Sequence, residues 1–168
     1  MQFLSGPMTQ LAWVVDDIEA TEQEFAVRNH VDRWTRLSDI RFGPETCVLR
    51  GRPADFVAHI SLSYVGDLQL ELIQPVEGNS IYTEFLDQHG PGLHHGCWEV
   101  ADLAATLDRA VEFDVVQAGS MADGQLRFAY LEPGLLGLPV VELTEVGELV
   151  RPFYDNIKSA CAAAARED

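Results

Sequence analysis

Two distant segments of this chain resemble each other. Residues 10–21, QLAWVVDDIEAT, align with residues 95–106, HGCWEVADLAAT, and five of the twelve aligned positions are identical. Each segment predicts a short apolar strand followed by an aspartate that caps a helix, over 18–28 in the first segment and over 103–113 in the second. An internal duplication explains this match better than two unrelated strand–helix units within one α+β domain.

A second pair of matching segments ends each repeat. Residues 66–75, GDLQLELIQP, and residues 137–146, GLPVVELTEV, both begin with glycine and carry a Glu-Leu pair five positions later. Between the opening and closing segments we expect further strands, over 46–49 and 57–64 in the first repeat and over 124–131 in the second. Each repeat then has the order β-α-β-β-β.

The repeats divide the chain into two small modules of one α+β domain. The first module covers residues 1–90 and the second residues 91–150, and a His-Gly-Pro-Gly turn at 89–92 lies where they meet. Residues 151–168 are rich in alanine and predict a C-terminal helix or tail. We expect this segment to dock on the outer side of the sheet, with capping of a cavity or packing in a dimer as the alternatives.

The chain is acidic, and its charge limits its partners. It has 11 Lys and Arg against 27 Asp and Glu, a formal net charge of −16 and a pI near 4.5, which argues against nucleic acid and against anionic membrane surfaces. The three cysteines, Cys47, Cys97 and Cys161, form neither a CxxC motif nor a disulfide framework. No apolar run approaches the ~18 residues of a membrane span, and no basic leader is present, so we expect a cytoplasmic protein.

Four polar residues stand at equivalent positions inside the apolar strands. Gln10 and His95 lie in the opening strands, and Glu71 and Glu142 lie in the closing strands. A buried unpaired charge is costly, so these residues need a partner. If the repeats pair about a pseudo-two-fold axis, all four side chains converge in one cavity. An amide oxygen, an imidazole and two carboxylates are ligands for a divalent ion such as Zn, Mn, Co or Ni.

These segments also resemble a known superfamily. The stretches TQLAWVVDDI (9–18), LELIQP (70–75), FLDQHGPGLHHGCWEV (85–100) and PVVELTE (139–145) are similar to the vicinal oxygen chelate superfamily, above all to methylmalonyl-CoA epimerase and glyoxalase I. The resemblance implies two tandem βαβββ modules forming a U-shaped, incompletely closed mixed sheet around a metal cavity, and a homodimer.

The resemblance also assigns the metal ligands and the chemistry. The ligands fall on Gln10, Glu71, His95 and Glu142, a set like that of glyoxalase I, whereas the epimerase usually has histidine at the first position. The implied activity is that of a metal-dependent isomerase, epimerase or lyase acting on a small molecule. Its ion stabilises an enolate, and Glu142 or Glu71 moves a proton on the carbon next to the carbonyl.

Two other functions stay open. The first is a metal-free protein of the same superfamily that binds or sequesters a small molecule, although such a protein has no need of two buried carboxylates. The second is an extradiol dioxygenase, whose iron typically takes two histidines and one carboxylate. Gln10 stands where that enzyme would carry a histidine, which makes the dioxygenase the weaker alternative.

The neighbours of these four residues have less specific roles. Strand alternation places His94 opposite His95, where we expect a structural role, and places Cys97 on the same face as His95, where we expect an inert packed thiol. A cluster of arginines either binds a carboxylate or phosphate of the substrate or forms a solvated helix–loop face. It holds six of the eleven basic residues: Arg28, Arg33, Arg36, Arg41, Arg50 and Arg52.

Overall fold

The computed structural model describes residues 4 and 6–164, and this part of the chain forms ten strands and four helices. Their order is β1 (Gln10–Val14), α1 (Ile18–Asn29), β2 (Thr35–Phe42), β3 (Cys47–Leu49), β4 (Arg52–Pro53), β5 (Phe56–Val65), β6 (Leu68–Gly78), α2 (Ile81–His89), β7 (Gly92–Glu99), α3 (Leu103–Leu107), β8 (Asp114–Met121), β9 (Leu126–Glu132), β10 (Val140–Val146) and α4 (Arg151–Ala164).

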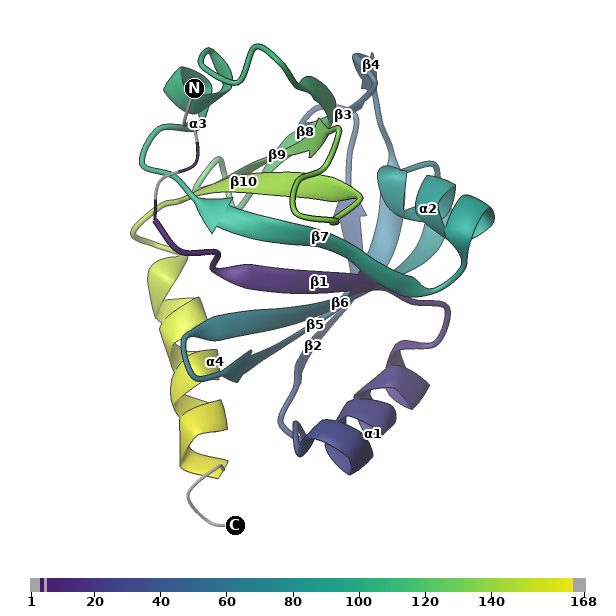
Figure 1. The fold of residues 1–168 in the computed structure, drawn as a ribbon, viewed down its shortest axis with the longest axis vertical. Coiled ribbons are helices and arrows are strands. Elements are labelled where there is room, and N and C mark those ends of the chain that lie inside the picture. Colours follow the sequence, from purple (N-terminus) through teal and green to yellow (C-terminus); the bar gives the residue numbers. More distant parts are fainter. Residues whose placement is uncertain (1–3, 5, 165–168) are drawn as a thin grey trace.

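All of these strands belong to one mixed sheet, whose order is β2-β5-β6-β1-β7-β10-β9-β8-β3-β4. Apart from the β3–β4 hairpin at one edge, the order is symmetric about the pair β1 and β7, which run antiparallel. Each of these strands also pairs parallel with the closing strand of its own repeat, β1 with β6 and β7 with β10. The sheet curls into an open half-barrel (Figure 1), which confirms the predicted α+β class with βαβββ units.

The two aspartates expected to cap helices do so. The Asp17 side chain accepts a hydrogen bond from the backbone N–H of Ala20 at the start of α1, and Asp102 accepts one from Ala105 at the start of α3, each at 2.9 Å. Helix α3 is shorter than expected and ends at Leu107 rather than near residue 113. Residues 108–113 instead form tight turns, in which several N–H groups bond to carbonyls three residues earlier.

The strand expected over 46–49 forms, but it does not lie in the sheet half of its own repeat. Strand β3 pairs with β8, so the β3–β4 hairpin of the first repeat extends the far edge of the second. Strands β2 and β8 and helix α2 were not expected. The alternation of β2 is hard to see in the sequence because Asp39 has a positive φ and the pairing with β5 shifts between Leu37 and Ile40.

The helices cover the two faces of the sheet differently. Helix α1 packs its Phe25 against Trp13 and Trp34, in a cluster that contains Leu72 of β6, and α3 packs with apolar residues of β9 and β10. Helices α2 and α4 instead contribute to the core of the inner face, and they flank the strands on opposite sides in Figure 1. None of the helices in the described residues is long and apolar enough to cross a membrane.

Helix α4 therefore corrects the expectation that the C-terminal segment docks on the outer side of the sheet. It lies on the inner face, against β5, and buries Ile157 and Cys161 there. Phe153 and Tyr154, one turn earlier, line the central cavity. The sequence predicts the apolar edge of this helix, but it does not predict which face of the sheet the helix packs against. Residues 165–168 of the expected tail lie outside the described residues.

Candidate functional site

Three ionisable side chains meet on the inner face, where β6, β7 and β10 lie near one another. The Nε2 atom of His95 is 3.0 Å from Glu142 Oε2 and 3.6 Å from Glu71 Oε2. The three possible ligand atoms all lie within 4.8 Å of one another. The strand register causes this meeting, because Ala12 of β1 lies opposite both Glu71 and His95. Neighbouring ligands on one ion, with bonds of about 2.1 Å, have separations close to 3 Å.

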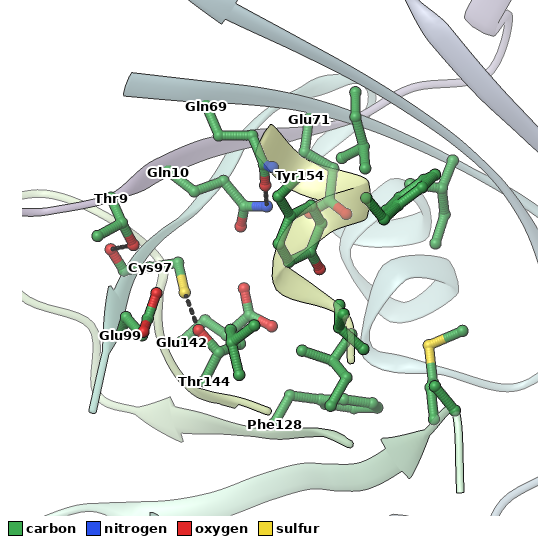
Figure 2. A pocket seen from close by; sticks show the side chains of 18 of the residues that line it. Thr9, Gln10, Gln69, Glu71, Cys97, Glu99, Phe128, Glu142, Thr144 and Tyr154 are labelled. Atoms are coloured by element: carbon green, nitrogen blue, oxygen red, sulfur yellow. Dashed lines mark hydrogen bonds between the residues drawn. The ribbon is translucent and has the colours of Figure 1, made fainter. Parts of the chain in front are cut away.

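The fourth expected residue, Gln10, lies beside them in the wall of the same cavity. Its amide Nε2 donates a hydrogen bond of 2.6 Å to Oε1 of Gln69 (Figure 2). Gln69 Nε2 in turn donates one of 2.7 Å to the hydroxyl of Tyr64. This relay uses the nitrogen of the Gln10 amide and leaves its oxygen free. We refer to Gln10, Glu71, His95 and Glu142 as the polar cluster.

The polar cluster fits a divalent ion. In the described residues three buried side-chain atoms have no hydrogen-bond partner, and two of them, Gln10 Oε1 and His95 Nε2, belong to the cluster. Both atoms can bind a metal ion through a lone pair. Gln10 Oε1 would otherwise carry the full cost of desolvation, whereas a protonated His95 Nε2 is compensated by the ion pairs with Glu142 and Glu71. The two carboxylates supply the negative charge that balances a dication. Gln10, Glu71, His95 and Glu142 are thus the residues that would hold it.

Burial and mutual attraction set the charge states of the cluster. Desolvation and the nearby Glu142 carboxylate raise the pKa of Glu71, although His95 opposes this shift. For His95 desolvation favours the neutral ring, but the attraction of Glu142 and Glu71 outweighs it and raises the pKa of His95 to about 9. Without a cation, therefore, the cluster holds a proton on His95 between the two carboxylates.

His94 contacts the cluster, contrary to the expectation that it faces away from His95. Its Nδ1 atom lies 2.9 Å from Nδ1 of His95, and the ring is fully buried beside Tyr82 and Phe85. The reason is a bulge in the pairing of β7 with β1. Ala12 pairs with His95 and Trp13 with Leu93, so His94 is the unpaired extra residue and strict alternation fails.

The His94 contact selects a tautomer of His95. Burial, with a smaller contribution from His95, lowers the pKa of His94 to about 2, so the His94 ring is neutral. If His95 offers the lone pair of Nε2 to an ion, its ring proton resides on Nδ1 and is donated to Nδ1 of His94. A metal-bound histidine typically donates its other ring N–H in this way. Sequence reasoning missed this partner because a bulge leaves no signal in the residue pattern.

Gln10, Glu71 and Glu142 of the polar cluster line a cavity of about 420 Å³, and His95 is fully buried beside them. In Figure 2 Glu71 and Glu142 project into this space from opposite strands, and Tyr154 of α4 lies over it. The remaining lining is mainly apolar and aromatic and includes Leu37, Phe42, Ile60, Leu62, Met121, Leu126, Phe128, Tyr130, Val146, Leu149, Val150 and Phe153.

Cys97 also lines this cavity. Its sulfur lies 3.1 Å from the hydroxyl of Thr144, and burial together with the Glu142 charge raises the pKa of the thiol well above its ordinary value. A thiol in such surroundings stays protonated and is a poor nucleophile. Cys97 thus lines the cavity rather than only packing in the core, and its lack of reactivity stays a prediction.

The arginine cluster does not lie at the site. Residues 35–42 form strand β2 rather than a helix–loop face, and four of the six guanidinium groups, those of Arg28, Arg36, Arg41 and Arg50, form ion pairs on the surface. Arg36 pairs with Glu22 at 2.6 Å, Arg41 with Asp55 at 2.5 Å and Arg50 with Glu84 at 2.7 Å. No described member of the cluster lines the cavity.

Comparison with known proteins gives the family. Residues 9–130 match the model of the Glyoxalase/Bleomycin resistance protein/Dioxygenase superfamily. No curated protein sequence matches the chain significantly.

Solved structures share the fold at low identity. A hypothetical protein from Bacillus halodurans is 18% identical with a TM-score of 0.61, and the match covers 84% of this chain and 95% of that one. Methylmalonyl-CoA epimerase from Mycobacterium tuberculosis is 17% identical with a TM-score of 0.56, covering 89% and 93%. A Streptomyces coelicolor methylmalonyl-CoA epimerase variant in complex with 2-nitronate-propionyl-CoA is also 17% identical, with a TM-score of 0.56 and coverage of 86% and 96%.

The family model spans most of the chain, including both opening strands and Glu71, and the neighbours share its curled mixed sheet. The chain belongs to the Glyoxalase/Bleomycin resistance protein/Dioxygenase superfamily.

Proposed function

We propose that the protein is a metal-dependent isomerase, epimerase or lyase that transfers a proton on a carbon next to a carbonyl group. The observation that carries this proposal is the polar cluster itself, in which two desolvated carboxylates meet a buried imidazole nitrogen next to an amide oxygen that has no hydrogen-bond partner. A small-molecule cavity adjoins the cluster. The epimerase structures that share the fold support the same class of reaction.

Gln10, His95, Glu71 and Glu142 hold the ion, which is Zn, Co, Ni or Mn. When bound, it acts as a Lewis acid that stabilises negative charge on the substrate oxygens, an effect worth several kcal/mol. The apolar walls exclude water and thereby strengthen every electrostatic interaction at the cluster. Glu71 or Glu142 accepts the substrate proton, since both carboxylates border the cavity.

The two alternatives fit less well. A metal-free binding protein would keep Glu71, Glu142 and a protonated His95 together in a desolvated wall, and such a buried group of charges is costly. An extradiol dioxygenase would need a second histidine ligand. Gln10 occupies the corresponding place, and His94 approaches the cluster only through the Nδ1 atom of His95.

Metal analysis coupled to proton exchange tests the proposal. We expect purified protein, loaded with each candidate ion, to bind about one ion per chain, and His95→Ala to lose it. Exchange of the α-proton in D₂O is then followed by NMR on methylmalonyl-CoA, the methylglyoxal–glutathione hemithioacetal and the neutral 1-hydroxy-1-phenylpropan-2-one. Glu71→Gln and Glu142→Gln should each reduce exchange, and His89→Ala at the end of α2 is the control. Full exchange by both carboxylate variants, or no ion in the wild type, contradicts the proposal.

Two further predictions accompany this function. A homodimer follows from the family resemblance, and light scattering tests it directly. The cytoplasmic location rests on the cysteines: Cys47, Cys97 and Cys161 are free, buried thiols, as expected of a protein kept in a reducing compartment.

A further inference from the structure

No described lysine or arginine lines the cavity. We infer that it takes an uncharged, largely apolar molecule whose two neighbouring oxygen atoms approach the polar cluster, and not an acyl-CoA or a glutathione thioester. This inference deepens the proposed function and rests on it for the ion, but it makes a separate statement about the rest of the ligand.

The charges around the cluster are balanced before any ligand enters. The carboxylates of Glu71 and Glu142 offset the two charges of a divalent ion. The third acid in the wall, Glu99, forms an ion pair with Arg151 at the start of α4. The other polar side chains of the wall are amides, hydroxyls and a thiol, and none of them supplies a positive charge. A carboxylate or phosphate on the ligand would add a charge with no counterpart, and burying such a charge is unfavourable.

The basic residues are held elsewhere. Of the lysines and arginines that the structure describes, none lines the cavity. Arg127 and Arg151, which flank the closing strand β10, pair with Glu145 and Glu99. The described arginines that have no carboxylate partner do not line the cavity either. Arg33 and Arg52 border separate surface hollows, and Arg109 contacts Thr106 behind α3.

The wall away from the cluster is suited to a hydrophobic body. Leu37 of β2, Ile60 and Leu62 of β5, Phe128 of β9 and Tyr154 of α4 face the same space. Near the start of α4 the lining continues with Leu149, which is 79% exposed and thus belongs to the rim. A volume of about 420 Å³ lies toward the small end of the usual 300–1,000 Å³ for small-molecule sites. The phosphates of a coenzyme A would therefore lie at a rim that is mainly apolar, and Arg151 beside it is already paired with Glu99.

A matched pair of probes tests the inference without requiring turnover. 4-Methylbenzohydroxamate and 4-carboxybenzohydroxamate have the same two chelating oxygens and differ at the far end of the ring, where one carries a neutral methyl group and the other a carboxylate. We expect the metal-loaded protein to bind the methyl probe at least about tenfold more tightly in calorimetry, a factor that corresponds to 1.4 kcal/mol. Propionyl-CoA should not displace it. Equal or tighter binding of the carboxylate probe overturns the inference.

Two substitutions at Leu149 on the rim distinguish an effect of charge on probe binding from an effect of shape. Leu149→Arg should narrow the gap between the two probes several-fold, whereas the uncharged Leu149→Gln should leave it unchanged. An unchanged gap in both variants contradicts the inference, because charge is then not its cause. Failure of the proposed function looks different. In that case His95→Ala binds both probes as the wild type does, and added ions have no effect.

Discussion

Inside the folded protein, His95 and Glu71 have raised pKa values. The proton on His95 is held by Glu142 and Glu71, and the pKa of the ring rises to about 9. An ion entering the cluster has to displace that proton, since a histidine ligand binds in its neutral form. Protons and metal therefore compete for the same atom, Nε2 of His95.

This competition predicts how stability depends on pH. The pKa of His95 is about 9 in the folded protein against an ordinary value of 6.5, so its stabilising contribution is complete below about pH 6.5 and is lost as the pH rises through about 9. The raised pKa of Glu71 acts in the same direction, since its contribution is complete below its ordinary value of 4.5. The melting temperature of the metal-free protein should fall between pH 6.5 and 9, by about 2–4 °C per kcal/mol lost.

Calorimetry or a thermal shift assay measures this slope. His95→Gln removes the titrating group and should flatten the slope between pH 6.5 and 9, whatever its own melting temperature. Added Zn²⁺ should stabilise the wild type more at pH 9 than at pH 6.5. Equal slopes for wild type and variant would show that His95 does not titrate as the geometry implies.

Strand pairing, rather than any single residue, orients the amide of Gln10. Strands β1 and β6 run parallel with Gln10 opposite Gln69, and this register brings the two amides within hydrogen-bonding distance. The hydroxyl of Tyr64, on the neighbouring strand β5, ends the relay. The relay occupies the nitrogen of Gln10 and keeps its oxygen available to an ion.

Removing the middle of the relay should therefore weaken metal binding without removing a ligand. We expect Gln69→Ala to lower the affinity for Zn²⁺ by about 10- to 100-fold, as is typical when the partner of a metal ligand is lost. Competition with a chromogenic chelator measures the change. Gln88→Ala, at an exposed position near the end of α2, is the matched control. Equal affinities of the two variants would show that the relay does not position Gln10.

Some strands and helices could be predicted from the sequence, and others could not. The opening and closing strands were predictable because ionisable residues recur at matched positions within apolar runs, and the helix starts because Asp17 and Asp102 are strong caps. Strand β2 was missed because its outward residues are charged and its edge position leaves them in solvent. The partner of β3 and the bulge at His94 depend on pairing between distant segments, which local patterns do not encode.

At the scale of the whole molecule, the two repeats share one sheet and one site. The first repeat contributes Gln10 and Glu71, and the second contributes His95 and Glu142. The central pairing of β1 with β7 and the pairing of β3 with β8 both join the repeats. Neither repeat contains a complete polar cluster or all of its strand partners.

This sharing predicts that the halves do not fold alone. Fragments 1–90 and 91–168, produced separately, should each lack the dispersed NMR spectrum and the cooperative unfolding of the intact chain. When the fragments are mixed, we expect native-like spectra to return in part and addition of Zn²⁺ to promote the association, because the ion needs ligands from both. A well-dispersed spectrum from either fragment by itself would instead identify two independent domains.

The β3–β4 hairpin also affects the order in which the chain can reach its native state during synthesis. Residues 47–53 leave the ribosome well before residues 114–121, which form the strand that β3 pairs with. In that interval the hairpin presents an open backbone edge, the kind of surface on which strands of other chains associate. The first repeat thus stays unfinished until the second is nearly complete. A nascent chain that stalls between these points is the form of this protein most exposed to aggregation.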